Sequence, residues 1–316
     1  MNRHSTNLAP IGISTYSRLK HLEQTIEALK RNSLAQSSEL FVFSDAPKPG
    51  DEAKVASIRA YLDSITGFKE ITIIKRGSND RVANCRGGTQ QLLDNHGKAI
   101  LLEEDIVTAP GFLCYMNEAL EFYKDAPNIL SISGYAPPIP IAVKDDIFVL
   151  PRFTAWGFAI TKEKYKRIKK IPPQAIKLID RKQMSRYGDD IYDMVCREAL
   201  GKLQAGDVRA MYAQYLDGSY TVYPRLSLVQ NIGHDGTGLH CKSSTRFTHE
   251  SLWQKKDGFQ FVSNPSINIE IVIANQIFRR KKRKIISTIK KHLGYYYLRD
   301  ALRGFFKLIT NHTKHK

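Results

Sequence analysis

Short apolar segments that alternate with amphipathic helical patterns dominate the first hundred residues. The segments 11–15, 40–43, 71–74 and 99–102 are nearly continuous runs of apolar or β-branched residues. Between them, apolar residues recur every three or four positions, as on one face of a helix. Continuously apolar strands that alternate with helices are typical of a parallel sheet covered on both faces. The sequence therefore predicts the α/β fold class. The helical positions are Leu19, Leu22, Ile26 and Leu29, then Val55, Ile58, Leu62 and Ile65.

The alternation becomes less regular after about residue 130, where Gly, Pro and aromatic residues are frequent. We expect a strand over 153–160, "FTAWGFAI", and a polar helix around 186–200. This half of the chain is predicted to form loops and a smaller mixed sheet. The expected organisation is one domain over 1–278, with halves 8–130 and 131–250, and a helical tail over 279–316.

Polar clusters follow three of the predicted parallel strands. Ser14 to Arg18, Ser44 to Asp45 and Glu103 to Asp105 all come where a strand ends. The carboxyl ends of parallel strands lie at one edge of a sheet, and ligands of open α/β sheets bind at that edge. We therefore expect the three clusters to meet at one ligand-binding edge.

Three consecutive carboxylates, Glu103, Glu104 and Asp105, lie between an apolar strand and an apolar helix that we expect to follow directly. They are either a solvated turn that leads into the helix or ligands of a divalent cation. Mg²⁺ and Mn²⁺ prefer oxygen ligands and are often held by one or two carboxylates together with substrate phosphates.

The formal net charge of +17 is concentrated at the end of the chain. Residues 279–316 contain 13 Lys or Arg and one acidic residue, which leaves only +5 for the other 278 residues. Because the rest of the chain is nearly balanced, we do not expect a nucleic acid partner. Apolar residues follow one face of the tail from Ile286 to Ile309, which predicts a basic amphipathic helix. Such a helix favours binding to an anionic membrane surface. A helix docked on the rest of the chain and a nucleic-acid patch are the alternatives.

The cysteines form neither a disulfide framework nor a zinc pattern, which favours a reducing, cytoplasmic compartment. No segment approaches the roughly 20 apolar residues that span a bilayer, and the N-terminus lacks the apolar part of a signal peptide. We therefore expect a chain that does not cross a membrane by itself. The cysteines are Cys85, Cys114, Cys196 and Cys241.

The segment "AILLEEDIVTAPGF" resembles metal-dependent glycosyltransferases of the GT-A fold, particularly those related to N-acetylglucosaminyltransferase I and family 2. Other segments occur in that family's order over most of residues 8–250: "IGIST" with "YSR", "FVFSDAPKPGDE", "FTAWGFAI", "YGDDIYDM" and "YPRLSLVQNIGHDG". The resemblance implies a Rossmann-like central sheet. It also implies transfer of a sugar from a nucleotide-diphosphate sugar to a hydroxyl of a glycan or lipid-linked glycan, with inversion and with Mn²⁺ or Mg²⁺.

The resemblance implies a role for each member of the acidic triplet. Asp105 would bind the metal, Glu104 would approach the ribose or the donor sugar, and Glu103 would support the site. This chain has Glu-Glu-Asp where the closest pattern has Glu-Asp-Asp, which makes the role of Glu104 less defined than that of Asp105. Further nucleotide contacts implied by the resemblance are Ser14, Thr15, Arg18, Asp45, Arg81 and Asn84.

In the second half, Asp190 resembles the family's catalytic base and Asp189 its neighbour in the acidic pair; the same pair would also suit the start of a helix. Trp156 and Gly157 would lie near the sugars, although a Trp in an aromatic run is also a core residue. His234 or His240 would contact the phosphates or the metal, with His240 preferred as the metal ligand; each is alternatively an exposed loop histidine.

Taken together, the sequence favours a metal-dependent hexosyltransferase of bacterial surface polysaccharide or lipopolysaccharide synthesis, peripheral on the inner face of the cell membrane. One alternative is a nucleotidyltransferase with a similar acidic metal site, although "ISTYSRLKHL" (13–22) lacks the glycines of a phosphate loop. The other is a non-catalytic membrane- or nucleic-acid-binding protein on a transferase scaffold.

Overall fold

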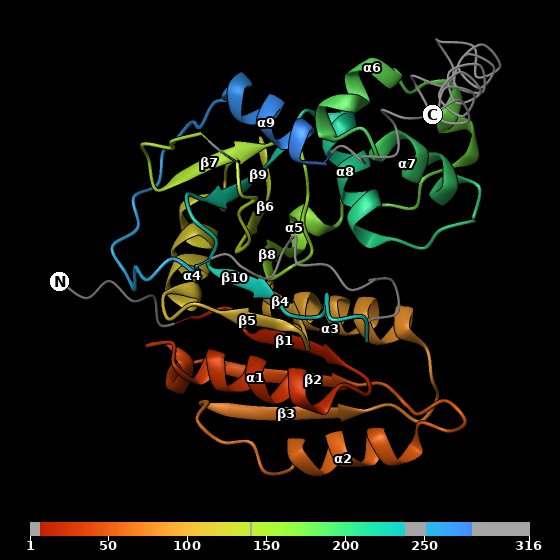
Figure 1. Ribbon diagram of the computed structural model, residues 1–316, viewed down its shortest axis with the longest axis vertical. Coiled ribbons are helices and arrows are strands. Elements are labelled where there is room, and N and C mark those ends of the chain that lie inside the picture. The colour runs from red at the N-terminus through yellow and green to blue at the C-terminus, as the bar shows by residue number, and fades with distance from the viewer. Residues whose placement is uncertain (1–6, 140, 238–250, 280–316) are drawn as a thin grey trace, which may run out of the picture. The chain divides into compact units, whose positions relative to one another are not determined.

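A computed structural model describes residues 7–139, 141–237 and 251–279. The described residues up to Phe278 belong to one compact unit. Its centre is an eight-stranded sheet in the order β3-β2-β1-β4-β8-β6-β9-β7 (Figure 1). The strands are β1 (Ile11–Thr15), β2 (Glu39–Ser44), β3 (Glu70–Lys75), β4 (Lys98–Glu103), β6 (Ile129–Ser133), β7 (Ile147–Leu150), β8 (Phe158–Thr161) and β9 (Tyr220–Pro224).

Strands β3, β2, β1 and β4 are mutually parallel, and β6 is parallel to β9, whereas β8 and β7 run antiparallel to their neighbours. The sheet is therefore mostly parallel, and the strands of the second half extend it. The α-helices are α1 (Leu19–Lys30), α2 (Glu52–Leu62), α3 (Gly88–His96), α4 (Phe112–Phe122), α5 (Lys162–Tyr165), α6 (Arg181–Met184), α7 (Ile191–Ala199), α8 (Gly206–Asp217) and α9 (Ile269–Arg279), and a π-helical turn, Ala83–Gly87, precedes α3.

Helices cover both faces of the parallel strands, as the sequence predicted. Ile11 and Ile13 of β1 share one buried cluster with the apolar face of α1, whose centre is Ile26. On the opposite face, Leu92 of α3 packs in a separate cluster with Phe43 of β2. Alternate residues of each strand thus contact different helices, which explains why these strands are apolar throughout. The predicted α/β fold class is confirmed.

The order of the strands creates a topological switch point at β1. The chain passes from β1 to β2 and β3 on one side, and then returns to β4 on the other side of β1. Ligands of open α/β sheets bind outside the carboxyl ends of the strands at such a point. The register places Ser14 of β1 beside Glu103 of β4, so the acidic triplet begins at this switch point.

The smaller sheet consists of two antiparallel strands, β5 (Ile106–Thr108) and β10 (Val229–Asn231). Because β5 follows the acidic triplet, the helix expected directly after the triplet begins only at Phe112. The strand expected over 153–160 also begins late, at Phe158. Gly157 has a φ of +62°, which lies outside the β region, so the expectation that Trp156 and Gly157 belong to a strand was wrong.

Two adjacent glycines at the start of α3 have matching helical backbone angles but different surroundings. A Cβ on Gly88 would lie 2.7 Å from the ring of Phe43, whereas a Cβ on Gly87 would meet no atom within 4 Å. We expect Gly88→Ala to lower the free energy of unfolding by about 1–3 kcal/mol through overpacking. Gly87→Ala, the matched control, should leave it unchanged or raise it by about 0.5–1 kcal/mol. Urea denaturation measures both, and equal midpoints for the two variants would contradict this packing.

Candidate active site

The three polar clusters at the strand ends meet at one edge of the sheet, as the strand pattern predicted. The backbone N–H of Asp45 donates to the carbonyl of Thr15 over 3.1 Å, which joins the ends of β2 and β1. Arg18, at the start of α1, reaches the end of β4. Its Nε donates to Glu104 over 2.9 Å and its Nη2 to Asp105 over 2.7 Å.

The ion pairs of Arg18 with Glu104 and Asp105 are largely shielded from water. The exposed fractions of the side chains are 18% for Arg18, 11% for Glu104 and 7% for Asp105. Burial by itself would lower the pKa of Arg18, but the two carboxylates outweigh it and the pKa is raised. Burial raises the pKa of Glu104, and Arg18 opposes that rise. The guanidinium therefore pairs with both buried carboxylates and holds them in place.

Several polar atoms at this edge are buried without a hydrogen-bond partner. Among the described residues, Oδ1 of Asp105, Nη1 of Arg18 and the hydroxyl of Thr15 neither donate nor accept a hydrogen bond. Buried polar groups are almost always paired in folded proteins. Their concentration at the switch point indicates a site for a polar ligand, and the oxygen of Asp105 suits a cation.

Glu103 differs from the other two carboxylates because its side chain is exposed. The surrounding protein still limits its hydration, and the charges of Asp105 and Glu104 add to this effect, so the pKa of Glu103 is raised to about 8. Arg18 and Arg81 oppose the rise without cancelling it. Neighbouring carboxylates that raise one another's pKa are common at functional sites. The excess negative charge of the triplet favours a cation.

A segment from the second half of the chain closes over Asp105. Ile232, which follows β10, donates its N–H to the carbonyl of Asp105 over 2.9 Å. A Cβ on Gly233 would lie 1.9 Å from Oδ2 of Asp105 and 2.7 Å from Nη1 of Arg18. Only glycine fits at this position. The pairing of β5 with β10 thus brings residues 231–234 against the acidic triplet.

His234 and Trp156 lie together beside this segment. Their ring centroids are 5.4 Å apart, and Trp156 also contacts Tyr135 edge-on at 4.8 Å. Burial lowers the pKa of His234, and the charge of Asp105 partly opposes this. The half-buried indole therefore lies near the acidic triplet, with His234 between the two.

Two of the predicted nucleotide contacts are engaged within the protein. The carboxylate of Asp45 accepts hydrogen bonds from the backbone N–H groups of Ala46 and Asp80 and from the side chain of Asn79. Asn84 donates to the carbonyl of Phe43 over 2.9 Å. These contacts stabilise the loops after β2 and β3. Arg81 is exposed and acts on Glu103 through its charge.

Asp190 forms a bidentate ion pair with Arg152. Both guanidinium Nη atoms lie 3.1 Å from a carboxylate oxygen, and Nη1 also donates to the carbonyl of Tyr187. Gly188 has a φ of +135°, and a Cβ there would strike both members of the pair. Asp189 and Asp190 directly precede α7, as the acidic pattern of a helix start predicted.

Arg152 and Trp156 are the ends of one five-residue segment, whose length is at most roughly 14 Å. This segment connects the Asp190 ion pair to the indole beside the acidic triplet. Sequence reasoning missed Arg152 and Gly233. The partner of Arg152 lies 38 positions away, and Gly233 contacts a residue more than 120 positions away, so no local pattern marks either of them.

His240 and the tail from residue 280 onward lie outside the described residues. Within the part of the chain that the structure describes, no three His, Cys, Asp or Glu side chains form a group that could hold a metal ion. A cation here would need ligands from a bound substrate, as is common for Mg²⁺. Among the described helices, none has the length and apolar composition to cross a bilayer.

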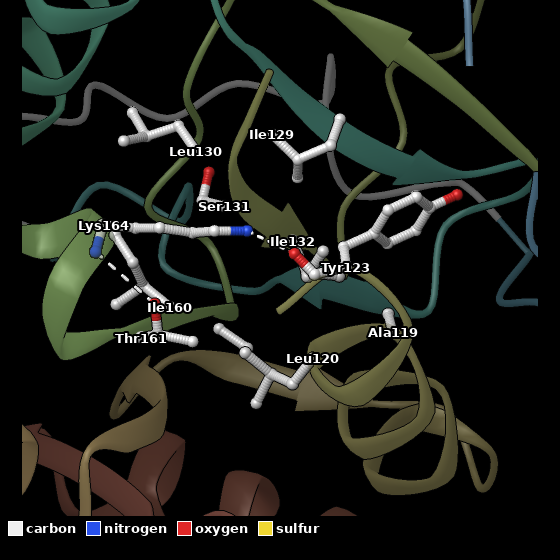
Figure 2. Close-up of a pocket in the computed structure, with 11 residues that line it drawn as sticks. Ala119, Leu120, Tyr123, Ile129, Leu130, Ser131, Ile132, Ile160, Thr161 and Lys164 are labelled. Carbon is white, nitrogen blue, oxygen red and sulfur yellow. Dashed lines mark hydrogen bonds between the residues drawn. The ribbon is translucent and has the colours of Figure 1, made fainter. Parts of the chain in front are cut away.

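A small pocket elsewhere in the molecule lies between α4, β6 and β8 (Figure 2). Its lining is mostly apolar, and its one charged residue is Lys164, whose Nζ donates to the carbonyl of Tyr123. Burial lowers the pKa of Lys164 to about 8. The pocket shares no lining residue with the acidic edge. The charged and unpaired groups at the switch point make that edge the candidate active site.

No protein family model matches this chain, and no curated protein matches it. Solved structures show weak similarity to it. S. aureus TarS is 11% identical, with a TM-score of 0.37, and the match covers 69% of this chain and 36% of TarS. GalNAc-T7 with UDP, GalNAc and Mn²⁺ is 12% identical, with a TM-score of 0.44 and coverages of 70% and 43%.

The mannosyltransferase PcManGT from Pyrobaculum calidifontis, in complex with GDP-Man and Mn²⁺, is 12% identical, with a TM-score of 0.35. The match covers 54% of this chain and 51% of PcManGT. The chain thus spans less than two thirds of each of these proteins. Every TM-score is below 0.5, so these similarities do not establish a function for this chain.

Arg18 is expected to be essential for stability. Arg18→Met leaves Glu104 and Asp105 buried without a counter-charge. This should lower the free energy of unfolding by about 3 kcal/mol near neutral pH. Loss of Arg18 raises the folded-state pKa of Glu104 further, so the folded variant binds protons more tightly than the unfolded chain does. The difference in free energy of unfolding between the wild type and Arg18→Met should therefore be small in acid and grow as the pH rises from about 5 to about 8.

Urea denaturation across this pH range measures the effect. Arg31→Met, which removes an exposed arginine directly after the same helix, is the control and should change stability by less than about 0.5 kcal/mol. A deficit of Arg18→Met that shrinks as the pH rises would show that Arg18 does not balance these carboxylates.

Proposed function

We propose that this chain is a GT-A glycosyltransferase that moves a sugar from a nucleotide-diphosphate sugar to a hydroxyl of a glycan or lipid-linked glycan. The observation that carries the proposal is the acidic triplet at the topological switch point, in which the buried Oδ1 of Asp105 has no partner among the described residues. A carboxylate of this kind suits a cation that a diphosphate also binds.

The residues present fit Mn²⁺ or Mg²⁺. Asp105 offers one buried oxygen, and Glu103 offers an exposed carboxylate whose pKa is raised by limited hydration and by the charges of Asp105 and Glu104. Arg18 fixes the other carboxylate oxygen of Asp105 together with Glu104, which limits how the pair can turn. When bound, the cation would neutralise the charge of the departing diphosphate. His240 is a further proposed ligand of the same cation.

The donor is proposed to lie along the carboxyl ends of β1, β2 and β4. Glu104 would face the ribose or the donor sugar, and the indole of Trp156 offers an apolar face to a sugar ring. Gly157 and His234 adjoin that indole. Further proposed nucleotide contacts are Ser14, Thr15, Arg18, Asp45, Arg81 and Asn84, of which Asp45 and Asn84 would act through the loops that they hold.

Asp190 is the proposed base, which would accept the proton of the acceptor hydroxyl as that oxygen forms its new bond to the sugar. The bidentate contact with Arg152 holds the carboxylate in one orientation. Asp189 precedes it in the same turn. An inverting outcome is part of this proposal, because inverting transfer uses a single carboxylate base.

The wider assignment is also a proposal. It includes the relation to N-acetylglucosaminyltransferase I and family 2, a role in bacterial surface polysaccharide or lipopolysaccharide synthesis, and the division into 8–130, 131–250 and a tail over 279–316. The tail would hold the enzyme on the inner face of the cell membrane through its excess of Lys and Arg.

Asp105→Asn tests the cation and the donor together. With Mn²⁺, the wild-type chain should be stabilised against heat by at least one of UDP-, GDP- and dTDP-sugars and should hydrolyse it slowly. The variant should lose the stabilisation and about a hundredfold of the hydrolysis. Asp94→Asn, an exposed carboxylate on α3, is the matched control and should behave as wild type.

If none of these nucleotide-diphosphate sugars stabilises the wild type with Mn²⁺, the proposal fails. Release of pyrophosphate from a nucleoside triphosphate would instead support a nucleotidyltransferase.

Asp190→Asn tests the base once an acceptor is known. Transfer should fall by about 10²–10⁴-fold while the KM for the donor stays nearly constant, because a base acts after donor binding. Asp193→Asn changes an exposed carboxylate three residues later, in the first turn of α7, and should retain transfer. Full transfer by Asp190→Asn would remove that residue from the mechanism.

A further inference from the structure

Exposed apolar side chains gather on one region of the molecule. Among the described residues, ten large hydrophobic side chains are exposed, and half of them lie within one stretch of 16 residues. Single exposed hydrophobic residues are ordinary, whereas a contiguous group usually marks an interaction surface. The five residues are Val262, Ile267, Ile269, Ile273 and Ile277.

Three of these isoleucines form a row on α9. Ile269, Ile273 and Ile277 are spaced four residues apart, so they follow one side of the helix over about 12 Å. Their exposed fractions are 61%, 47% and 59%. We call this row the isoleucine face of α9.

The opposite side of α9 is fixed to the sheet. Ile271 and Val272 are buried in a cluster with Phe148 of β7 and Tyr223 of β9. Figure 1 shows α9 beside the end of the sheet that β7 and β9 form. Near one edge of the isoleucine face, the side chain of Gln276 donates to the carbonyl of Ser185 over 2.9 Å. These contacts define the rotation of the helix and leave the isoleucine face uncovered by the described residues.

We propose that the isoleucine face of α9 docks on a bilayer that contains anionic lipid. The last residue of α9, Arg279, is the first of six consecutive basic residues that end at Lys284. Apolar side chains that enter the boundary between headgroups and acyl chains, next to a basic segment, are the two elements of interfacial binding to anionic lipid.

The charge distribution favours lipid over a protein partner of the same sequence. A second copy seated on this face would bring two runs of six basic residues close together, and like charges repel. The chain's own segment 285–316 adds Lys290, Lys291 and Arg299, so it would also bring positive charge to a positive region. An anionic lipid surface would instead neutralise the positive charge of residues 279–284. The inference rests on the membrane role proposed for the tail, but it is independent of the catalytic assignment, because α9 contributes no residue to the candidate active site.

Binding to vesicles of equimolar phosphatidylglycerol and phosphatidylcholine tests this inference in the full chain. The variant Ile269→Gln/Ile273→Gln/Ile277→Gln should preserve α9, because glutamine has a high helix propensity. It also retains every basic residue. We expect its affinity in a sedimentation assay to fall at least about tenfold, because the apolar contribution is lost. Leu178→Gln/Leu216→Gln, which replaces two exposed leucines elsewhere, is the matched control and should bind as wild type. Unchanged binding of the triple variant would overturn the inference.

A second measurement locates the contact even if the basic tail dominates the affinity. Tryptophan in Ile273→Trp should be quenched by brominated phosphatidylcholine in such vesicles, whereas tryptophan in Leu216→Trp should show no more quenching than wild type. Equal quenching in both variants would contradict docking through α9. A concentration-dependent dimer of the wild type, absent in the triple glutamine variant, would also overturn the inference, since a second copy would then occupy the face.

Discussion

The ion pairs of Arg18 with Glu104 and Asp105 connect the first helix of the sheet to the end of its central strand. Two neighbouring carboxylates with little access to water would destabilise the fold without a buried cation. Helix α1 holds the same acidic turn at a further point, because the hydroxyl of Thr25 donates to the carbonyl of Glu104 over 2.8 Å. Just after the helix, Asn32 donates to Thr108 of β5, the strand that follows the turn. The switch point of the sheet is therefore a region where stability depends on charge balance, and there the remaining negative charge can bind a ligand.

Much of the first half could be predicted because its signals are local. A continuous apolar strand and a helical stripe are each visible within a dozen residues, and the parallel sheet follows from their alternation. The meeting of Ser14, Asp45 and Glu103 at one edge follows from the same alternation, because parallel strands end on one side. The sequence could not indicate which of the three polar groups would remain accessible.

The parts that were missed depend on contacts between distant segments. The pairing of β5 with β10 joins residues about 120 positions apart, and it interposes a strand where a helix was expected. Asp45 and Asn84 are the residue types of a ligand site, yet Asp45 accepts from the backbone of Asp80 in the loop after β3, and the amide of Asn84 donates to the backbone of β2 at Phe43. The requirement for glycine at position 233 arises only because Asp105 lies against it. Tertiary packing decides such cases, and composition gives no indication of them.

The segment from Arg152 to Trp156 has a consequence for how two parts of the site are joined. One end carries the partner of Asp190 and the other carries the indole that packs on His234. Between them, Phe153 is buried and Thr154 bonds to Tyr223, so the interior of the segment is held as well as its ends. Asp190 is joined to this segment through the side chain of Arg152. A shift of the backbone at residues 153–155 would therefore displace the ion pair and the indole together.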